Sequence, residues 1–258
     1  MTDPSTVCGV SLVGLPAGTL GRVAEFGPYF AVSTGPVAEP GWRPVRALYT
    51  DPVALAGLVG RVRVRLDVGD GRVAASILVQ GHAARLWSLS LGTWFHAGLI
   101  PDLHPDVLWW RDEDGSVRLH LERAQGWAGG HLEDVLAATV IGAHLAPMIT
   151  AVHRLGPLSD RLLWGNAASA LLGAARVIDG APTGPARAVT DRLLNKGPLR
   201  GSIAARPDGG HRRRSCCLFY RVPGAGLCGD CALTHAPPPW AGERGGRSWA
   251  WVDELVQR

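Results

Sequence analysis

Over most of the first 200 residues, the hydrophobic positions recur at the spacing of helices. The clearest stretch is Val73 to Ala97, whose apolar residues spread around nearly the whole circumference of a helix. A helix that is apolar on nearly every side belongs in the interior of a fold. We therefore predict a long buried helix there, and we interpret Gly81 as a point where another helix approaches closely.

Capping residues and prolines predict where the neighbouring elements begin and end. Asp51 and Pro52 are typical of a helix N-cap and its first residue, so we expect a helix from Pro52 towards Leu66. The other expected elements are a helix near Leu20–Phe26, a short strand around Tyr29–Val32, and helices over about Glu133–Leu155 with a kink at Pro147, Arg161–Ile178 after a cap at Ser159, Pro185–Lys196 and Ser248–Gln257.

One segment changes to the alternating period of a strand. Residues 117–121 alternate apolar and polar side chains, and Asp114-Gly115 supplies a turn before them. We therefore expect a β-hairpin over residues 107–121. Because successive side chains of a strand point to opposite faces, one of Trp109 and Trp110 should face the core.

The composition changes sharply after Gly201. Gly, Pro, Arg and Cys dominate the remaining sequence, and the hydrophobic periodicity disappears. We therefore predict an α+β protein. Residues 1–200 are expected to form a mainly α-helical domain with a small β-hairpin, and residues 201–258 a loop-rich C-terminal cysteine module.

Composition narrows the class of protein. With 258 residues, 47% of them hydrophobic, the chain can bury a sizeable core, and 19% charged residues do not suggest disorder. The formal charge of +4 is a mild excess. Nucleic-acid binding usually needs a concentrated basic face, so we expect none, although a positive protein favours docking with an acidic partner.

Targeting signals are weak. Residues 1–18 contain Asp3 and lack both a basic start and a long apolar core, so they do not resemble a secretory signal. The stretch from Val135 to Val152 has no charged residue, but it contains Pro147 and barely reaches the roughly 20 residues that cross a bilayer. We interpret it as a core helix and expect a cytoplasmic protein with no integral membrane segment.

Four of the five cysteines gather near the C-terminus, at Cys216, Cys217, Cys228 and Cys231. Their pattern is CC-x10-C-x2-C. Without an export signal, clustered cysteines bind metal more often than they form disulfides. Four thiolates can hold a zinc ion or an iron–sulfur cluster. Cys8 stands apart and is interpreted as a thiol of no special role.

The adjacent cysteine pair distinguishes the two kinds of site. Neighbouring side chains in an extended backbone point to opposite sides, so two adjacent thiolates reach one ion only from a bent backbone. A 2Fe–2S cluster has two metals and a wider footprint, which favours the cluster and leaves zinc as the alternative. His211 and His235 flank the module, but four cysteines suffice as ligands.

Arginines surround the cysteines at positions 212–214 and at Arg221. Reduction adds negative charge to an anionic cluster, so nearby positive charge should stabilise the reduced form and raise the reduction potential. The alternative is that these arginines are solvated or pair with acids such as Asp208 and Asp230.

The module resembles a known family. The run from Arg214 to Arg221, continued by Pro223-Gly224 and by Cys228-Gly229-Asp230-Cys231, is similar to the C-terminal cluster motif of the FhuF-like ferric siderophore reductases. The stretch around His144-Leu145-Ala146-Pro147 and the run Leu163–Ser169 also resemble the domain that precedes the motif in that family. The similarity extends over about Glu133 to Leu233.

The resemblance implies a 2Fe–2S cluster held by Cys216, Cys217, Cys228 and Cys231. It also implies a cytoplasmic reductase that transfers one electron to ferric siderophores, of hydroxamate type, and releases Fe(II). No dinucleotide-binding motif occurs in the chain, so the electron should come from a ferredoxin or a flavin reductase. The alternatives are a structural or interaction protein stapled by zinc, and an iron–sulfur sensor of redox state or iron.

A few candidate residues lie outside the module. Trp164, Asn166 and Ser169 fit a siderophore pocket, although core packing and helix-end hydrogen bonds explain them equally well. We interpret Arg154 and Arg161 as exposed side chains at helix ends rather than as anion ligands. We interpret His144 and His153 as packed or solvated side chains rather than as metal ligands.

Overall fold

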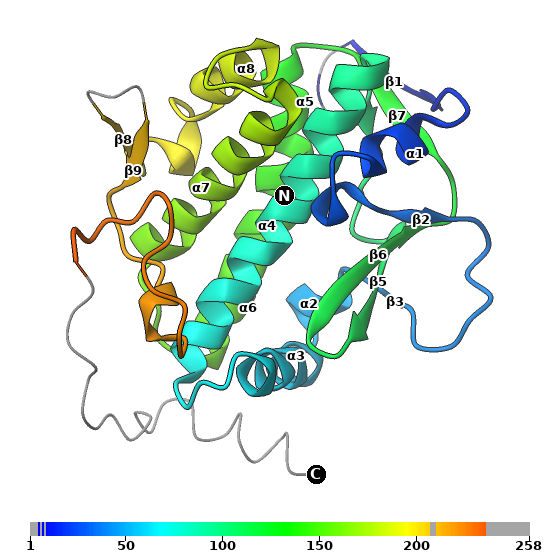
Figure 1. Ribbon diagram of the computed structural model, residues 1–258. Coiled ribbons are helices and arrows are strands. Elements are labelled where there is room, and N and C mark those ends of the chain that lie inside the picture. Colours follow the sequence, from blue (N-terminus) through cyan, green and yellow to red (C-terminus); the bar gives the residue numbers. More distant parts are fainter. Residues whose placement is uncertain (1–4, 6, 8, 207–209, 236–258) are drawn as a thin grey trace.

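The centre of the protein is a layer of long helices (Figure 1). The computed structural model describes residues 5, 7, 9–206 and 210–235. Helix α4 (Gly71–Ala97) runs through the middle, and α7 (Asp160–Asp179) packs along it. Buried residues occur on every side of α4, and Trp87 is 0% exposed. The predicted buried helix is therefore confirmed.

The glycine of α4 that allows a close approach is Gly92, and our interpretation of Gly81 was wrong. A Cβ atom at Gly92 would lie 2.9 Å from Val23 in α1 (Thr19–Ala24) and 3.1 Å from Phe30 in η2 (Pro28–Phe30), a 3₁₀ helix. A Cβ atom at Gly81 would meet only a guanidinium nitrogen of Arg85, at 3.5 Å. Helix α1 is therefore fixed against α4 at Gly92.

The helices that flank α4 begin where capping residues predict. Helix α3 (Pro52–Arg65) follows α2 (Ala47–Thr50), and the Asp51 carboxylate accepts the N–H groups of Val53 at 2.9 Å and Ala54 at 3.1 Å. Helix α8 (Pro185–Leu193) has a cap that the sequence did not reveal, because Asp179 at the end of α7 accepts N–H groups from its first turn. Ser159 stands at the N-cap of α7 but makes no side-chain cap bond.

The predicted helical region after residue 132 is confirmed but irregular. It consists of α5 (Leu132–Leu136), the π-helical segment η3 (Ala137–Leu145) and α6 (Ala146–Leu155). The departure from α geometry precedes Pro147, which lacks an N–H for the ladder. By length and composition Leu132–Leu155 could cross a membrane, but 72% of its most apolar window is buried inside the fold, as we expect of a core helix.

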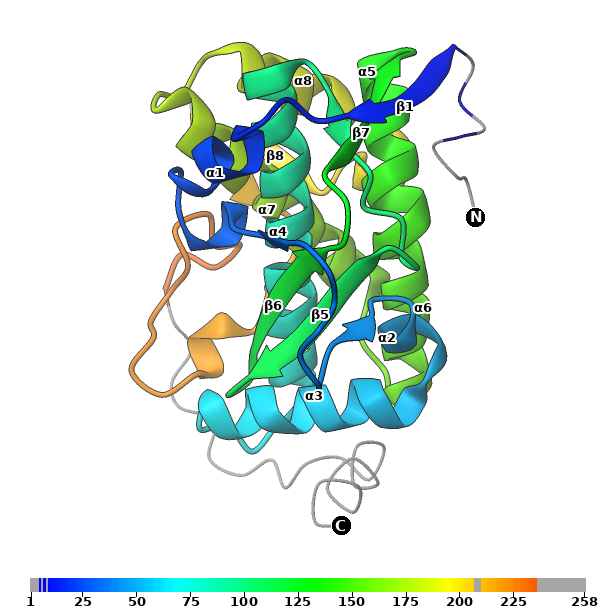
Figure 2. The same ribbon diagram turned by 90° about the vertical axis from the view of Figure 1, so that its right-hand side faces the viewer.

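The predicted hairpin is confirmed as β5 (Leu108–Glu113) and β6 (Ser116–Leu121). Trp110 is 3% exposed and Trp109 is half-buried, so one of the two faces the core. The hairpin is the middle of a sheet in the order β2-β6-β5-β3, in which β2 (Ser33–Thr34) is parallel to β6. The outer strand β3 (Arg43–Pro44) pairs with β5. Figure 2 shows α3 crossing below this hairpin.

A second small sheet was not predicted. It has the order β1-β7-β4 and joins β1 (Val10–Gly14), β7 (Gln125–Gly129) and β4 (Ile100–Pro101) in antiparallel pairs. Strand β4 has only two residues, β1 is mostly exposed and β7 contains two glycines, so none of the three carries an alternating pattern. The strand expected around Tyr29–Val32 was wrong, because η2 occupies its first half and β2 begins only at Ser33.

The cysteine module lies against α4 and α7, on the side away from the β5–β6 hairpin (Figure 1). Its described elements are β8 (Ile203–Ala205), β9 (His211–Arg213) and η5 (Phe219–Arg221), and η4 (Gly197–Leu199) precedes them. The expected α+β class, mainly helical with a small hairpin and C-terminal cysteines, is confirmed. The helix expected over Ser248–Gln257 lies outside the described residues, as does Cys8.

Candidate metal centre

The four C-terminal cysteines occupy two turns of the module. Cys216 and Cys217 lie between β9 and η5, where Leu218 takes a left-handed conformation with φ of 67° and its N–H points to the Cys216 sulfur at 3.4 Å. In the second turn, the Cys231 N–H donates to the Cys228 carbonyl at 3.1 Å. The bend after Cys217 is the departure from an extended backbone that adjacent thiolates need to reach a common centre.

The Sγ atoms of Cys217 and Cys228 are 3.7 Å apart. Two thiolates on one tetrahedral metal, each bonded at about 2.3 Å, would lie about 3.8 Å apart, so this pair fits a shared metal. Within the described ranges, no three His, Cys, Asp or Glu side chains gather around a single ion.

The thiols influence one another. A hydrogen bond from Cys228 and the positive charge of Arg213 lower the pKa of Cys217 to about 7, against the effect of burial. Burial raises the pKa of Cys216, and the charges of Cys231 and Cys228 add to that rise. Burial also raises the pKa of Cys231, and Cys228 contributes to it. All four thiols thus lie within electrostatic reach of one another.

Arg213 is the charged group of this centre, and its side chain is 1% exposed. One guanidinium nitrogen donates to the Cys228 sulfur at 3.0 Å and lies 2.9 Å from Asp230, and a second donates to the Asn166 amide oxygen at 2.8 Å. Burial lowers the pKa of Arg213, but Asp230 and the thiolates of Cys217 and Cys228 raise it overall. The guanidinium therefore stays charged inside the protein.

The other arginines of the module contact groups other than the cysteine sulfurs. Arg212 donates to the backbone carbonyls of Cys231 at 3.2 Å and of Ala232. Arg214 is exposed, and Arg221 pairs with Asp70, the N-cap of α4, at 2.9 Å. Of the four arginines, Arg213 alone contacts a cysteine sulfur in the described structure, and it also has the predicted pairing with Asp230. Asp208 lies outside the described residues.

A buried clamp of hydrogen bonds joins the module to α4 and α7. The Ser76 hydroxyl donates to the Cys217 carbonyl at 2.7 Å, and the Asn166 amide donates to the Ser76 carbonyl and hydroxyl, each at 2.9 Å. Asn166 is 1% exposed and also accepts from Arg213. Gly165 beside it is required, because a Cβ atom there would lie 2.4 Å from the Ser215 hydroxyl. The clamp fixes Cys217 and Arg213 to helices α4 and α7, which belong to the helical domain that we call the body.

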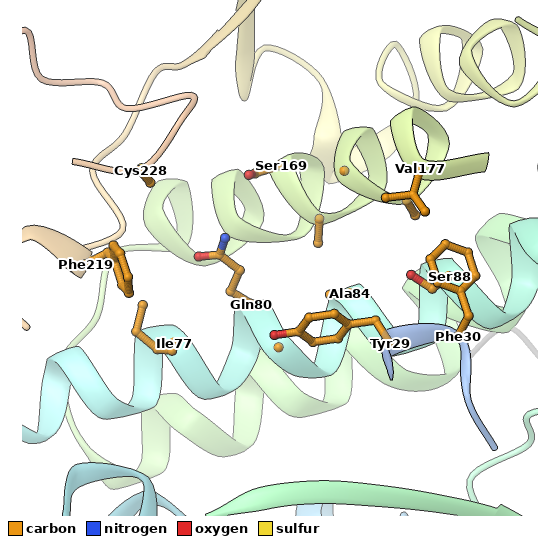
Figure 3. Close-up of a pocket in the computed structure, with 14 residues that line it drawn as sticks. Tyr29, Phe30, Ile77, Gln80, Ala84, Ser88, Ser169, Val177, Phe219 and Cys228 are labelled. Carbon is orange, nitrogen blue, oxygen red and sulfur yellow. The ribbon is translucent and has the colours of Figure 1, made fainter. Parts of the chain in front are cut away.

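A cavity of about 440 Å³ lies between α4 and α7, with Cys228 and Phe219 at one end (Figure 3). Ser169 lines this cavity. Trp164 instead lines a second cavity of about 250 Å³ together with Arg161, while Asn166 lines neither. The three residues that fitted a siderophore pocket in the sequence therefore do not share one.

The histidines of the module have partners other than cysteine. His211 contacts a guanidinium nitrogen of Arg187 at 2.5 Å, and burial, with the charge of Arg187, lowers the pKa of His211. His235 is exposed, and its Nδ1 lies 3.1 Å from the Thr234 hydroxyl. Outside the module, Arg154 is exposed as expected, and His153 lies 3.5 Å from Asp160.

A buried network that sequence reasoning missed joins His82, Tyr49 and His144. The Tyr49 hydroxyl lies 2.8 Å from Nε2 of His82 and 2.6 Å from Nδ1 of His144, and Nε2 of His144 donates to the Leu103 carbonyl at 2.5 Å. Burial lowers the pKa of each histidine to about 3, so both are neutral. His144 is thus a packed side chain, and its partners come from distant helices, which no local pattern indicates.

Comparison with known proteins finds relatives of the cysteine module. Residues 213–233, which contain all four cysteines, match the family model of the FhuF 2Fe–2S C-terminal domain. The chain is also 31% identical over 108 residues to a ferric siderophore reductase of Escherichia coli K12, an alignment that covers 37% of this chain. The chain spans 39% of the length of that relative. The resemblance to the FhuF-like proteins is confirmed, and the cofactor that it indicates is a 2Fe–2S cluster.

Proposed function

We propose that this protein is a one-electron reductase that delivers electrons to ferric siderophores and so releases Fe(II). Cys216, Cys217, Cys228 and Cys231 would hold its 2Fe–2S cluster. The observation that carries the proposal is the match of residues 213–233 to a 2Fe–2S domain. The substrate is supported by the name of the relative, a ferric siderophore reductase.

The residues around the thiols suit an electron-transfer centre. When bound, a 2Fe–2S cluster supplies a carrier of single electrons. The buried guanidinium of Arg213 places one positive charge against Cys228, where it stabilises the negative charge that reduction adds. The N–H groups of Leu218 and Leu233 point to the sulfurs of Cys216 and Cys231 at 3.4 and 3.3 Å, and hydrogen bonds of this kind also favour the reduced form.

Release of iron from a ferric siderophore needs a carrier of one electron. Siderophores hold Fe(III) through hard, anionic oxygens, and the same ligands hold Fe(II) far more weakly. One electron delivered to the complex therefore frees the iron. We propose a hydroxamate-type siderophore as substrate, a ferredoxin or a flavin reductase as the electron donor, and the cytoplasm as the site of action. The formal charge of +4 supports docking with an acidic donor.

The first experiment is anaerobic purification of the full chain. We expect a coloured protein with about two irons per chain, whose visible absorbance bleaches with dithionite and gives an EPR signal. Mixing the reduced protein with ferrioxamine B and an Fe(II) chelator should restore the absorbance and colour the chelator. A colourless protein with about one zinc per chain would replace the proposal with a zinc-stapled interaction protein. A cluster that gives no electron to the siderophore would favour a sensor.

A further inference from the structure

We infer that the cavity between α4 and α7 is the site where the ferric siderophore binds, and that the electron leaves the protein beside Cys228. The inference rests on the proposed function and identifies where its substrate binds. The cavity, about 440 Å³, lies in the roughly 300–1,000 Å³ range of small-molecule sites. It begins at Cys228 and Phe219 and extends between the two helices towards Tyr29 and Val177 (Figure 3).

The two helices are built to leave this space open. Gly81 and Ala84 line the cavity from α4, and Gly173 and Ala174 line it from α7. A Cβ atom at Gly173 would have nothing within 4 Å, so the groove there is free space, and α4 and α7 do not close over it. Small residues on facing helices usually let the helices approach each other. Here they line a hollow that any larger side chain would fill.

The lining suits an uncharged ligand. None of the described residues that line the cavity carries a formal charge, and its polar groups are neutral, namely Gln80, Ser88, Ser169 and the hydroxyl of Tyr29. Three hydroxamate anions around Fe(III) sum to zero charge, so such a complex loses little hydration here. A tris-catecholate complex carries three negative charges, and the guanidinium groups beside this lining are already engaged. Arg213 donates to Gln80 and pairs with Asp230, and Arg85 lies over the Tyr29 ring.

The position of Cys228 connects the cavity to the proposed cluster. Cys228 lines the cavity with part of its surface, lies 3.7 Å from the Cys217 sulfur and accepts the hydrogen bond from Arg213. A siderophore in the groove would therefore approach the centre at its charged side. In the reaction the ferric ion gains one electron and becomes Fe(II), no bond to the protein forms, and the ferredoxin or flavin reductase replaces the electron.

A side chain at Gly173 tests the site without touching the cysteines. Gly173→Phe should fill the groove. Gly21→Phe adds the same side chain on the exposed side of α1, away from the cavity, and serves as the matched control. Both glycines lie in helices, and no atom lies within 4 Å of the added Cβ at either position. We expect Gly173→Phe to slow the reduction of ferrichrome, an uncharged ferric trihydroxamate, by at least about tenfold and Gly21→Phe to change it by less than about twofold. The EPR spectrum and reduction potential should be unchanged in both.

Binding is measured separately with the gallium(III) complex of the same siderophore, which accepts no electron. By titration calorimetry with the full chain, its Kd should rise at least about tenfold in Gly173→Phe and stay within about twofold in Gly21→Phe. If Gly173→Phe loses its cluster, Val177→Trp at the far end of the cavity takes its place, with the same expectation. The wild type should also bind a gallium tris-catecholate more weakly than the trihydroxamate.

The outcomes separate this inference from the proposed function. A wild-type protein that reduces no ferric siderophore would refute the proposed function itself. A wild type that does so, with variants that bind and reduce the trihydroxamate equally well, would overturn the cavity as the site and leave the reductase intact. If the electron donor reduced the Gly173→Phe protein more slowly, while that protein passed its electron to the siderophore at the wild-type rate, the groove would be the donor's docking site. That result would also overturn the inference.

Discussion

The helical body and the cysteine module are stabilised by different kinds of contact. The body has a continuous apolar core, in which residues such as Trp87, Leu86 and Leu89 are 0% exposed. Among the described residues from 201 onwards, the only buried ones are Arg213 and Cys217. One of these is charged and the other is a candidate metal ligand. A segment with no apolar core of its own needs other support, such as a metal or polar contacts with a larger domain.

The module has polar contacts of this kind with the helical domain. Ser76 of α4 bonds the Cys217 carbonyl, and Asn166 of α7 bonds Arg213. Arg221 pairs with Asp70 at the start of α4. We therefore expect the body to tolerate loss of the metal, and the module to depend on both the metal and the body. Four variants or conditions test this contrast.

The largest effect is expected from removal of a cysteine. Cys228→Ser removes one of the two sulfurs that are 3.7 Å apart, so iron content should fall by at least about tenfold, and the visible absorbance should disappear. The body should keep its helical circular dichroism and a cooperative thermal transition. Cys8→Ser is the control and should keep the iron. Full iron content in Cys228→Ser would reject the ligand assignment.

The second effect concerns the body alone. Because burial lowers the pKa of His82 and His144 from 6.5 to about 3, the unfolded chain binds more protons than the folded chain between these values. The free energy of unfolding should therefore be flat above pH 6.5 and fall below it, by about 2 kcal/mol per histidine at pH 5. Urea denaturation at pH 7 and pH 5 measures this fall.

Tyr49→Phe removes the hydroxyl that joins the two buried rings and should lower stability at both pH values. A free energy of unfolding that stays constant between pH 7 and pH 5 would contradict the neutral buried pair.

The third effect tests the clamp between the regions. Asn166→Ala removes the amide that bonds Ser76 and Arg213, so about 2 kcal/mol of unfolding free energy should be lost. Release of iron to a chelator should accelerate, because the cysteine pair is fixed through Ser76. Asn195→Ala is the control, since Asn195 is exposed and its side-chain amide donates to the backbone carbonyl of Asp191. Equal iron release in both variants would show that the module does not depend on the clamp.

The smallest effect is on the reduction potential. Arg213→Gln removes the buried charge beside Cys228, so the potential should fall by roughly 60 mV, which is about 1.4 kcal/mol for one electron. Arg213→Lys keeps the charge but loses the forked hydrogen bonds of the guanidinium, so the potential should fall less than in Arg213→Gln. Arg214→Gln, an exposed neighbour, should shift it little. Equal shifts in Arg213→Gln and Arg214→Gln, measured by redox titration, would show that burial of the charge has no role.

Local patterns were sufficient for some elements and not for others. Asp51 and Pro52 predicted the start of α3, and the apolar surface of α4 and the turn at Asp114-Gly115 were equally clear. The strands β1 and β7 were missed because each is short and becomes a strand only through pairing with the other across the chain. The close approach was misplaced on Gly81 because the sequence does not say which glycine faces Val23.

The four cysteines, the class of cofactor that they indicate and the long helices were all readable from local sequence, because each depends on residues a few positions apart. The contact of Arg213 with Cys228, the clamp at Asn166 and the position of Gly173 beside a cavity emerged only from the fold. Ser76 and Cys217 are 141 positions apart and Asn166 and Ser76 are 90 apart. Contacts at such separations arise from the packing of α4 against α7 and of the cysteine module against α4, which no periodicity within one helix encodes.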